Sequence, residues 1–279
     1  MKGLFSLLRL PYWMMTGGLS LITAFAISNE IINIQKILLI FFSMAFITSA
    51  GFSINDYFDR ESDAIIKPKR PIPSGLFSLK QVIIISGILF FTGLGLASLI
   101  NWLSFIILLI DSFLLLIYSA FIKRKSGFAA NILIGLLVGT AFIYGEATIF
   151  QTISIISISL YPICFGTISG NILRDVLSLE GDSKVGYPTL PKQVGVRNSV
   201  LIAVAFFIAT AIFAPLPYFL VPFGIFYLTL ISFWSILLLI ASIRLLISPS
   251  TVSNVKKYER MVTMSMIFLL LSLILEAVF

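Results

Sequence analysis

Apolar residues fill nine long runs of the chain, and short polar segments separate these runs. Each run approaches the ~20 residues that an α-helix needs to cross the hydrocarbon core of a bilayer. The runs cover residues 11–28, 37–54, 81–100, 102–121, 128–146, 152–170, 199–217, 222–246 and 261–279. The pattern therefore predicts an all-α polytopic membrane protein, with nine transmembrane helices in a single domain over residues 1–279.

The composition agrees with a membrane protein and restricts the chemistry available to it. Hydrophobic residues make up 59% of the chain and charged residues 11%, whereas soluble domains carry about 25% charged residues. The chain has no histidine, which is the usual proton-transfer residue and the commonest metal ligand. Its single cysteine, Cys164, lies in an apolar run and is expected to be a small buried hydrophobe. Any chemistry must therefore use carboxylates, amides, hydroxyls, cationic side chains and bound ions.

The basic residues predict the orientation of the helices. With nine spans, 18 of the 19 Lys and Arg residues fall on one side of the membrane, and only Lys36 falls on the other. Cytoplasmic loops carry the excess of Lys and Arg, so this face and the N-terminus are expected to be cytoplasmic and the C-terminus outside. The net charge of +7 then reflects topology and contact with anionic lipid, and no nucleic-acid partner is expected.

An acidic segment directly follows the second run, although topology does not require acids there. On a helix that continues past the membrane, Asn55, Asp56, Asp59 and Asp63 fall within about 100° of one another around the axis. Carboxylates this close repel each other unless a cation lies between them, and an all-oxygen ligand set suits Mg²⁺. We therefore expect these four residues to be metal ligands.

A second acidic segment follows the sixth run on the same face of the membrane. Asn171, Asp175, Ser178 and Asp182 share one helical stripe, although Gly181 is expected to distort the last turn. As in the first segment, an Asp follows the Asn after four residues. The two copies predict a weak internal repeat, with halves near residues 11–125 and 128–246 that face each other. The alternative is that both segments are ordinary polar loops.

Cationic side chains lie close to both acidic segments. The cations expected to bind a diphosphate are Lys67, Arg70, Arg174 and Lys184, with Lys69 beside them. Carboxylates that hold Mg²⁺ next to such cations form a diphosphate site, which makes Asp59, Asp63, Asp175 and Asp182 the candidate catalytic residues. A diphosphate site that opens into a helix bundle favours a substrate with an ionic head and a lipid tail, such as a prenyl diphosphate. Either an Asp or the released diphosphate would take the proton of the acceptor.

Both segments resemble the signatures of a known family, the UbiA-type intramembrane prenyltransferases. Its first signature, NDxxDxxxD followed by bases and RPIPSG, is similar to residues 55–63 and 70–75. Its second signature, a Lys or Arg followed by Asp, then EGD and TLP, is similar to residues 174–175, 180–182 and 189–191. The chain departs from the pattern at Ser178, where many members have Asp.

The resemblance implies a nine-helix fold of two pseudo-symmetric four-helix halves plus one helix, around a central cavity that opens sideways to lipid. It implies two Mg²⁺ ions held by Asn55, Asp59, Asp63, Asp175 and Asp182, with Asp56 nearby. It also adds Lys123 to the cations expected to bind the diphosphate. The residues expected on the substrate side are Tyr118, Asn131, Asn171, Ser178 and Tyr187.

The same resemblance implies Mg²⁺-dependent transfer of a prenyl group from a prenyl diphosphate to a lipophilic acceptor. Residues 55–75 are most similar to the archaeal members that transfer a geranylgeranyl group to geranylgeranylglyceryl phosphate in ether-lipid synthesis. The alternative is an aromatic prenyltransferase of quinone, chlorophyll or haem biosynthesis.

A cation-coupled transporter is the rival class, with Asp111 and the acidic segments as ion sites. Transporters place such sites near the membrane midplane, whereas these carboxylates lie at helix ends beside bases that would repel a cation. A lipid head-group phosphotransferase also uses clustered Asp and Mg²⁺, but its DG-x-x-AR signature is absent. Asp111 itself, in mid-span, is either functional or a protonated acid bonded to a neighbouring helix. Glu146 is expected at the outer membrane interface.

Overall fold

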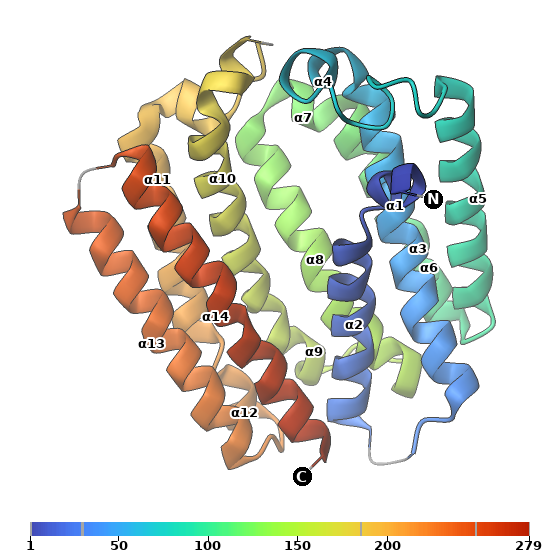
Figure 1. Ribbon diagram of the computed structural model, residues 1–279. Coiled ribbons are helices and arrows are strands. Elements are labelled where there is room, and N and C mark those ends of the chain that lie inside the picture. The colour runs from blue at the N-terminus through green and yellow to red at the C-terminus, as the bar shows by residue number, and fades with distance from the viewer. Residues whose placement is uncertain (1, 29–30, 185, 249, 279) are drawn as a thin grey trace.

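The protein is a bundle of long helices (Figure 1). The computed structural model describes residues 2–28, 31–184, 186–248 and 250–278. Within these ranges no strand is present, and nine helical spans are long and apolar enough to cross a membrane. This confirms the predicted all-α polytopic fold.

The long helices account for most of the chain, and short segments extend or join them. The long helices are α2 (Leu10–Ile27), α3 (Ile34–Phe58), α5 (Leu79–Ser98), α6 (Trp102–Ile117), α8 (Gly127–Phe150), α10 (Cys164–Lys184), α11 (Leu190–Phe213), α13 (Ile225–Ile247) and α14 (Val252–Val278). The short ones are α1 (Lys2–Leu8), α4 (Arg60–Ile66), the π-helical η1 (Tyr118–Ile122), α7 (Lys123–Lys125), α9 (Ile155–Leu160), the 3₁₀-helical η2 (Tyr161–Ile163) and α12 (Leu216–Leu220).

Polar residues at the ends of the apolar runs set where several helices begin. Asn33 accepts a hydrogen bond from the backbone of Lys36 at 2.9 Å, and Asn101 accepts one from Ser104 at 2.8 Å. The Ser78 hydroxyl accepts from Gln81 N, while the Gln81 side chain accepts from Ser78 N. Each such cap satisfies a backbone N–H that the helix leaves unpaired, and contributes about 0.5–2 kcal/mol.

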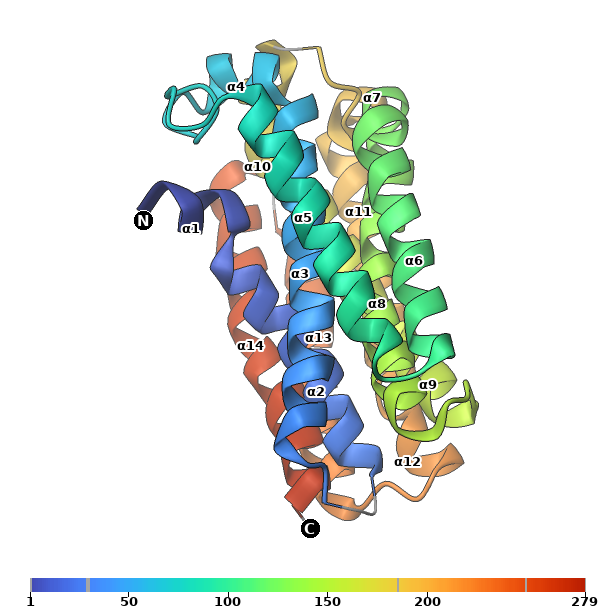
Figure 2. The same cartoon turned by 90° about the vertical axis from the view of Figure 1, so that its right-hand side faces the viewer.

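The helices pack in a closed series. α3 packs against α2, α5 and α6, and α10 packs against α8 and α11, while α13 contacts α11 and α14. The series closes because α14 contacts both α2 and α10, and α2 also packs on α8. Figure 2 shows that α1 turns away from the bundle, whereas α4 and α7 both lie at one end of it, on different sides. The division into two pseudo-symmetric halves stays a prediction.

Several helices extend further than the apolar runs predicted. α11 begins at Leu190 and α14 at Val252, where the apolar pattern placed the starts at residues 199 and 261. Hydropathy detects only the part of a helix in the hydrocarbon, and a helix keeps its hydrogen bonds beyond it. The expected distortion at Gly181 was wrong, because α10 continues to Lys184. Residue 279, the end of the last predicted run, lies outside the described residues.

Candidate active site

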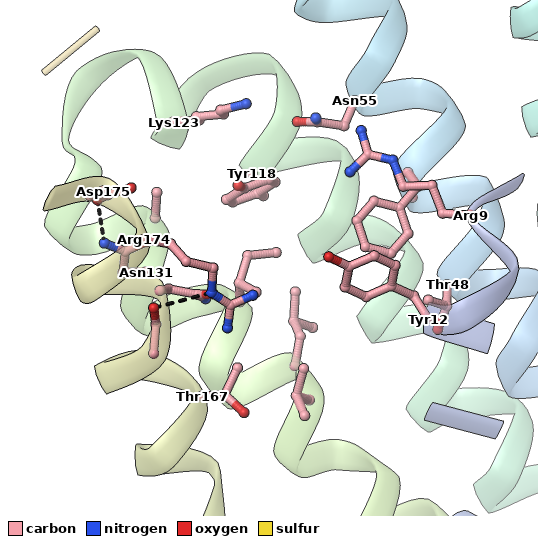
Figure 3. Close-up of a pocket in the computed structure, with 18 of the residues that line it drawn as sticks. Arg9, Tyr12, Thr48, Asn55, Tyr118, Lys123, Asn131, Thr167, Arg174 and Asp175 are labelled. Atoms are coloured by element: carbon pink, nitrogen blue, oxygen red, sulfur yellow. Dashed lines mark hydrogen bonds between the residues drawn. The ribbon is translucent and has the colours of Figure 1, made fainter. Parts of the chain in front are cut away.

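A cavity of about 420 Å³ opens between the helices at the end that carries α4 and α7. Charged and polar side chains line its head, and Figure 3 shows several of them extending from α2, α3 and α10 toward its middle. Further along the helices the lining is mostly apolar and includes Met44, Ile47, Leu115, Ile134 and Leu137, although Asp111 and Thr167 also line it. The site therefore joins an ionic compartment to an apolar one.

Asp59 lies at the junction between α3 and α4 and is the most heavily bonded acid of the site. It ends α3 with φ −85° and ψ −1°, and α4 starts at the next residue. Asn55 Nδ2 and the Tyr187 hydroxyl each donate a hydrogen bond to it at 2.8 Å, and the Lys123 ammonium forms an ion pair with it. Side chains from three separate segments thus converge on one buried carboxylate.

Two arginines neutralise the other acids of this segment. Arg9 Nη2 lies 2.6 Å from Asp56 Oδ1, and Arg70 pairs with Asp63 while Arg70 Nη1 also lies 3.3 Å from Asp56 Oδ1. Arg9 adopts a left-handed backbone conformation (φ 53°) between α1 and α2, and its guanidinium lies 4.6 Å from the ring centroid of Phe52. A positive φ is uncommon for a non-glycine residue and marks a constrained position. Each Asp of the first segment therefore has a cation of the same chain as its counter-ion.

Burial and these cations shift the pKa values of the acids at the head of the cavity in opposite directions. Burial raises the pKa of Asp59, but the charge of Lys123 and the hydrogen bonds from Lys123, Tyr187 and Asn55 together hold it below its ordinary value. Burial raises the pKa of Asp63 above its ordinary value despite the Arg70 guanidinium beside it. Burial, and then the charge of Arg70, lowers the pKa of Lys67. The neighbours of Asp59 therefore favour its ionised form.

The π-helical segment η1 connects two predicted site residues, Tyr118 on the substrate side and Lys123 among the diphosphate cations. A π turn inserts an extra residue into a helix and is frequent at functional sites. Here it lies at the end of α6, so that Tyr118 and Lys123 both line the cavity. Figure 3 shows Tyr118 between Lys123 and the middle of the cavity. The position of Lys123 beside Asp59 therefore depends on this local change of helical pitch.

The second acidic segment is the last part of α10, and its predicted stripe faces the cavity. Asn131 Nδ2 on α8 donates to Asp175 Oδ2 at 2.7 Å, and the Ser178 hydroxyl donates to Asp182 Oδ2 at 2.5 Å. Ser178, the residue that departs from the family pattern, thus bonds to one of the predicted metal ligands. Asn171 lies on the same wall.

The two acidic segments meet over the head of the cavity. The Tyr187 hydroxyl lies 3.1 Å from the Ser62 hydroxyl in addition to its bond with Asp59. A Cβ added to Gly181 would lie 3.3 Å from Ile66 Cγ2, which places the end of α10 against the end of α4. The expectation that the two helix ends face a shared site agrees with these contacts.

The structure places most of the predicted site residues on the wall of this one cavity. The residues that line it are Asn55, Asp59, Asp63, Lys67, Arg70, Tyr118, Lys123, Asn131, Asn171, Arg174, Asp175, Ser178, Asp182 and Tyr187. Asp56 does not line it, because Arg9 and Arg70 engage the buried Asp56 carboxylate. Lys184 does not line it either, because it lies at the exposed end of α10.

Sequence reasoning missed two charged residues that line the cavity. Arg9 carried only the signal of a lone basic residue before the first apolar run, which topology explains equally well. Glu259 is the eighth residue of α14, in a stretch that the apolar pattern assigned to a loop. Its position on a helix that faces the cavity could not be seen without the packing of α14 against α10.

The donor atoms of the site fit a hard divalent cation. Within the described residues, no three carboxylates are close enough together to form a metal site by themselves. However, Asn55 Oδ1 is a buried acceptor on the cavity wall without a hydrogen-bond partner in the described chain, and buried acceptors are normally satisfied. The neighbouring ligand atoms are carboxylate oxygens, which Mg²⁺ prefers and which leave places for water and phosphate oxygens. The residues therefore fit a magnesium ion completed by a substrate.

Two further acids have structural partners inside the bundle. Asp111 lines the cavity and accepts a hydrogen bond from Thr140 on α8 at 2.6 Å. Glu146 is fully buried within the bundle near the end of α8, and its expected position at the outer membrane interface stays a prediction. Its carboxylate accepts from the backbone of Ser154 and Ser157 at 3.0 and 3.3 Å and from both hydroxyls. The first turn of α9 leaves backbone N–H groups without a partner inside the helix, and these groups stabilise the buried carboxylate of Glu146.

Comparison with known proteins gives a consistent result. The model of the UbiA prenyltransferase family matches residues 15–271. A digeranylgeranylglyceryl phosphate synthase of Methanothrix thermoacetophila is 34% identical over 257 residues, which are 90% of this chain and 92% of the relative. A solved structure described as digeranylgeranylglyceryl phosphate synthase in membranes superposes with a TM-score of 0.84 at 32% identity, covering 99% of this chain and 98% of that one. A UbiA homologue from Archaeoglobus fulgidus bound to DMAPP and Mg²⁺ superposes with a TM-score of 0.75 at 20% identity, covering 98% and 99%.

The fold and the site together define an integral membrane enzyme whose cavity has an ionic head and an apolar interior. The chain belongs to the UbiA prenyltransferase family and is a prenyltransferase.

Proposed function

We propose that the protein transfers a geranylgeranyl group from geranylgeranyl diphosphate to geranylgeranylglyceryl phosphate, as in archaeal ether-lipid synthesis. The observation that carries this proposal is one cavity whose head brings together the acids of both segments and several cations, and whose interior is apolar. An ionic head and a long apolar tail are the two parts of a prenyl diphosphate. Relatives in several archaea that are 30–36% identical to the chain bear the name digeranylgeranylglyceryl phosphate synthase, which supports this acceptor.

The head of the cavity is suited to hold Mg²⁺, and we propose two ions. Asn55, Asp59 and Asp63 would hold one ion from the α3 side, and Asp175 and Asp182 would hold the other from α10. When bound, the ions neutralise the charge that grows on the departing diphosphate. Lys123 and Arg70, which pair with Asp59 and Asp63 in this structure, would leave these acids to the metal and pair with diphosphate oxygens instead.

Three cations of the first half then bind the diphosphate. Lys67, Arg70 and Lys123 all line the head of the cavity on the side of α4 and α7. Arg70 and Lys123 already lie next to acids that we propose as metal ligands. Their positive charge favours cleavage of the bond between the allylic carbon and the diphosphate oxygen, because it stabilises the leaving group.

The apolar interior holds the prenyl tail and keeps water from the allylic cation. As the carbon–diphosphate bond breaks, the hydroxyl oxygen of the acceptor forms the new ether bond to the same carbon. The hydroxyl proton passes to a carboxylate at the head of the cavity or to the released diphosphate. No covalent intermediate with the chain is needed, so the absence of histidine is no obstacle.

We also propose that this end of the bundle faces the cytoplasm. The N-terminus would then be cytoplasmic and the C-terminus outside, since Lys and Arg gather in the segments on the side of α4 and α7. The lipid bilayer would deliver both substrates sideways to the cavity.

The test is a transfer assay with purified protein, geranylgeranyl diphosphate and a panel of acceptors. Mass spectrometry is expected to find the doubly prenylated glyceryl phosphate when Mg²⁺ is present and to find none after chelation by EDTA. Transfer to 4-hydroxybenzoate in place of the glyceryl lipid would support the aromatic alternative instead. Prenyl transfer that continues at full rate without a divalent metal would overturn the proposed role of the acids.

A further inference from the structure

Arg174 differs from the arginines and the lysine that neutralise the first acidic segment. Arg9, Arg70 and Lys123 each pair with an acid of that segment. Arg174 instead donates from Nε to the backbone oxygen of Gly170 at 3.1 Å, one turn earlier on α10. Its acidic neighbour is Glu259 on α14, with Nε 3.7 Å from Oε1. Arg174 therefore belongs to the opposite side of the cavity from the three cations that we propose for the diphosphate.

The guanidinium of Arg174 extends into open space within the cavity. Its side chain is 48% exposed although the residue lines the cavity wall. In Figure 3 it points toward the middle of the cavity, whereas Asp175, the next residue, points toward Asn131. Consecutive residues of α10 thus serve two different parts of the cavity, and Arg174 approaches α14 through its Nε, which lies near Glu259.

The contact between Arg174 and Glu259 is one that a stronger anion can replace. A separation of 3.7 Å is too long for a hydrogen bond, and a half-exposed ion pair contributes little. The Glu259 carboxylate also accepts a hydrogen bond from Thr263 at 3.1 Å, so it keeps a partner when Arg174 leaves. A phosphate monoester carries a charge of about −1.5 to −2 and three acceptor oxygens, which match the two-pronged geometry of arginine.

Polar groups beside Arg174 are available for the rest of a glycerol phosphate head. Asn171 and Thr167 precede Arg174 in the chain by about one and two turns of α10 and lie on the same face of this helix, deeper in the cavity. Neither side chain has a hydrogen-bond partner in the described part of the chain, although both line the cavity. Their amide and hydroxyl groups lie where the glycerol oxygens of a lipid would follow its phosphate.

From this geometry we infer that Arg174 binds the phosphate of the acceptor lipid, in place of the donor diphosphate that the sequence pattern predicted for it, and that Glu259 holds its guanidinium until the phosphate displaces it. The inference rests on the proposed function, since it assigns the second anionic head group of that reaction. The donor diphosphate then lies on the side of α4 and α7, and the acceptor phosphate on the side of α10 and α14. Two anions are thereby kept apart by separate cations within one cavity.

Steady-state kinetics of Arg174→Gln, Arg174→Lys and Glu259→Gln test the inference. Arg174→Gln is expected to raise the KM for geranylgeranylglyceryl phosphate by about tenfold to a hundredfold, as for a lost charge-assisted hydrogen bond, with the KM for geranylgeranyl diphosphate within about twofold. Arg174→Lys keeps the positive charge but not the paired N–H donors of the guanidinium, so its acceptor KM is expected to lie between those of wild type and Arg174→Gln. Glu259→Gln removes the competing carboxylate and lowers the acceptor KM roughly threefold, an effect that disappears in the Arg174→Gln background.

The control and the acceptors separate phosphate recognition from other effects. Lys192→Gln removes an exposed charge near the start of α11 and is expected to change neither KM. Geranylgeranylglycerol, the acceptor without its phosphate, is expected to react poorly and equally with wild type and Arg174→Gln. Glycerol 1-phosphate is expected to inhibit wild type more than Arg174→Gln, which shows that the phosphate is recognised apart from the lipid tail.

Two results would overturn the inference while leaving the proposed function intact. One is an Arg174→Gln variant whose KM rises for geranylgeranyl diphosphate and not for the acceptor, which would place Arg174 in the donor site. The other is a Glu259→Gln variant that weakens acceptor use, which would exclude displacement. Conversely, if wild type forms no ether product but binds geranylgeranylglyceryl phosphate through Arg174 in calorimetric titrations, the proposed function fails and the inference stands.

Discussion

Asp59 shows how one carboxylate serves both the folded state and the proposed reaction. Its oxygens receive bonds from Asn55, Lys123 and Tyr187, which come from three different segments. These donors hold the acid ionised and in a fixed position. Glu61, only two residues away, has an 85% exposed side chain and, among the residues that the structure describes, pairs with its neighbour Arg60 alone.

At the residue scale we therefore predict opposite results for these two acids. Asp59→Asn is expected to lower the rate of Mg²⁺-dependent diphosphate release by about a hundredfold or more, because a proposed metal ligand and the anchor of Lys123 are both lost. Glu61→Gln is expected to leave the rate within about twofold, because an exposed ion pair contributes little. A diphosphate-release assay on both purified variants checks this. Full activity in Asp59→Asn would remove Asp59 from the site.

At the scale of single elements, the π-helical segment η1 determines which residues of the α6 end reach the cavity. Deleting Ala120 would remove the extra residue and restore an ordinary helical pitch, which rotates Lys123 by about 100° relative to Tyr118. We expect the deletion to lower kcat/KM by about as much as Lys123→Ala, while thermal unfolding in detergent changes little. A deletion variant with wild-type kinetics would show that the π turn does not position Lys123.

The packing of α8 against α10 is a second element on which the site depends. A Cβ added to Gly135 on α8 would lie only 2.2 Å from Ile168 Cγ1 and 3.2 Å from the Ile168 backbone nitrogen. Two helices that come this close keep Asn131 beside Asp175. Small residues at such contacts are a common feature of helix packing in membranes.

Gly135→Ala is accordingly expected to destabilise the protein by about 1–3 kcal/mol through overpacking. The matched control is Gly87→Ala on α5, where an added Cβ meets nothing within 4 Å and where alanine favours the helix by up to about 1 kcal/mol. Thermal unfolding in detergent should show a lower Tm for the first variant and an equal or higher Tm for the second. Equal Tm values for all three proteins would contradict the close contact.

At the scale of the whole molecule, charge predicts the orientation in the membrane. Cys164 is buried, and a Cys164→Ala background would allow single cysteines to be placed at Lys125, beside α7, and at Thr152, at the opposite end of the bundle. In right-side-out vesicles, a maleimide that cannot cross membranes is expected to label Thr152→Cys and to leave Lys125→Cys unlabelled until the vesicles are opened. The reverse pattern would invert the proposed topology.

The fold was more predictable from sequence than the site was. Length and hydropathy suffice to detect helices that cross a membrane, and a period of 3.6 residues suffices to align Asn55 with Asp59 and Asn171 with Asp175. The partners of these acids are distant in sequence: Lys123 meets Asp59 across 64 positions and Arg9 meets Asp56 across 47. Such contacts depend on tertiary packing. A local sequence pattern therefore cannot predict that Arg9 lines the cavity and pairs with Asp56, or that Asp56 does not line the cavity.

The arginines and the lysine that cover the acids of the first segment have a consequence for life in a membrane with a variable supply of substrate. Without counter-ions, carboxylates crowded at the head of the cavity would repel one another whenever magnesium became scarce, and this repulsion would separate the helices that carry them. Because the chain supplies its own counter-charges, the enzyme without metal and substrate should stay folded, and it should resume turnover without having to refold. The stability of the substrate-free enzyme and its catalysis then depend on the same few cations, which pair with carboxylates in one state and with the substrate in the other.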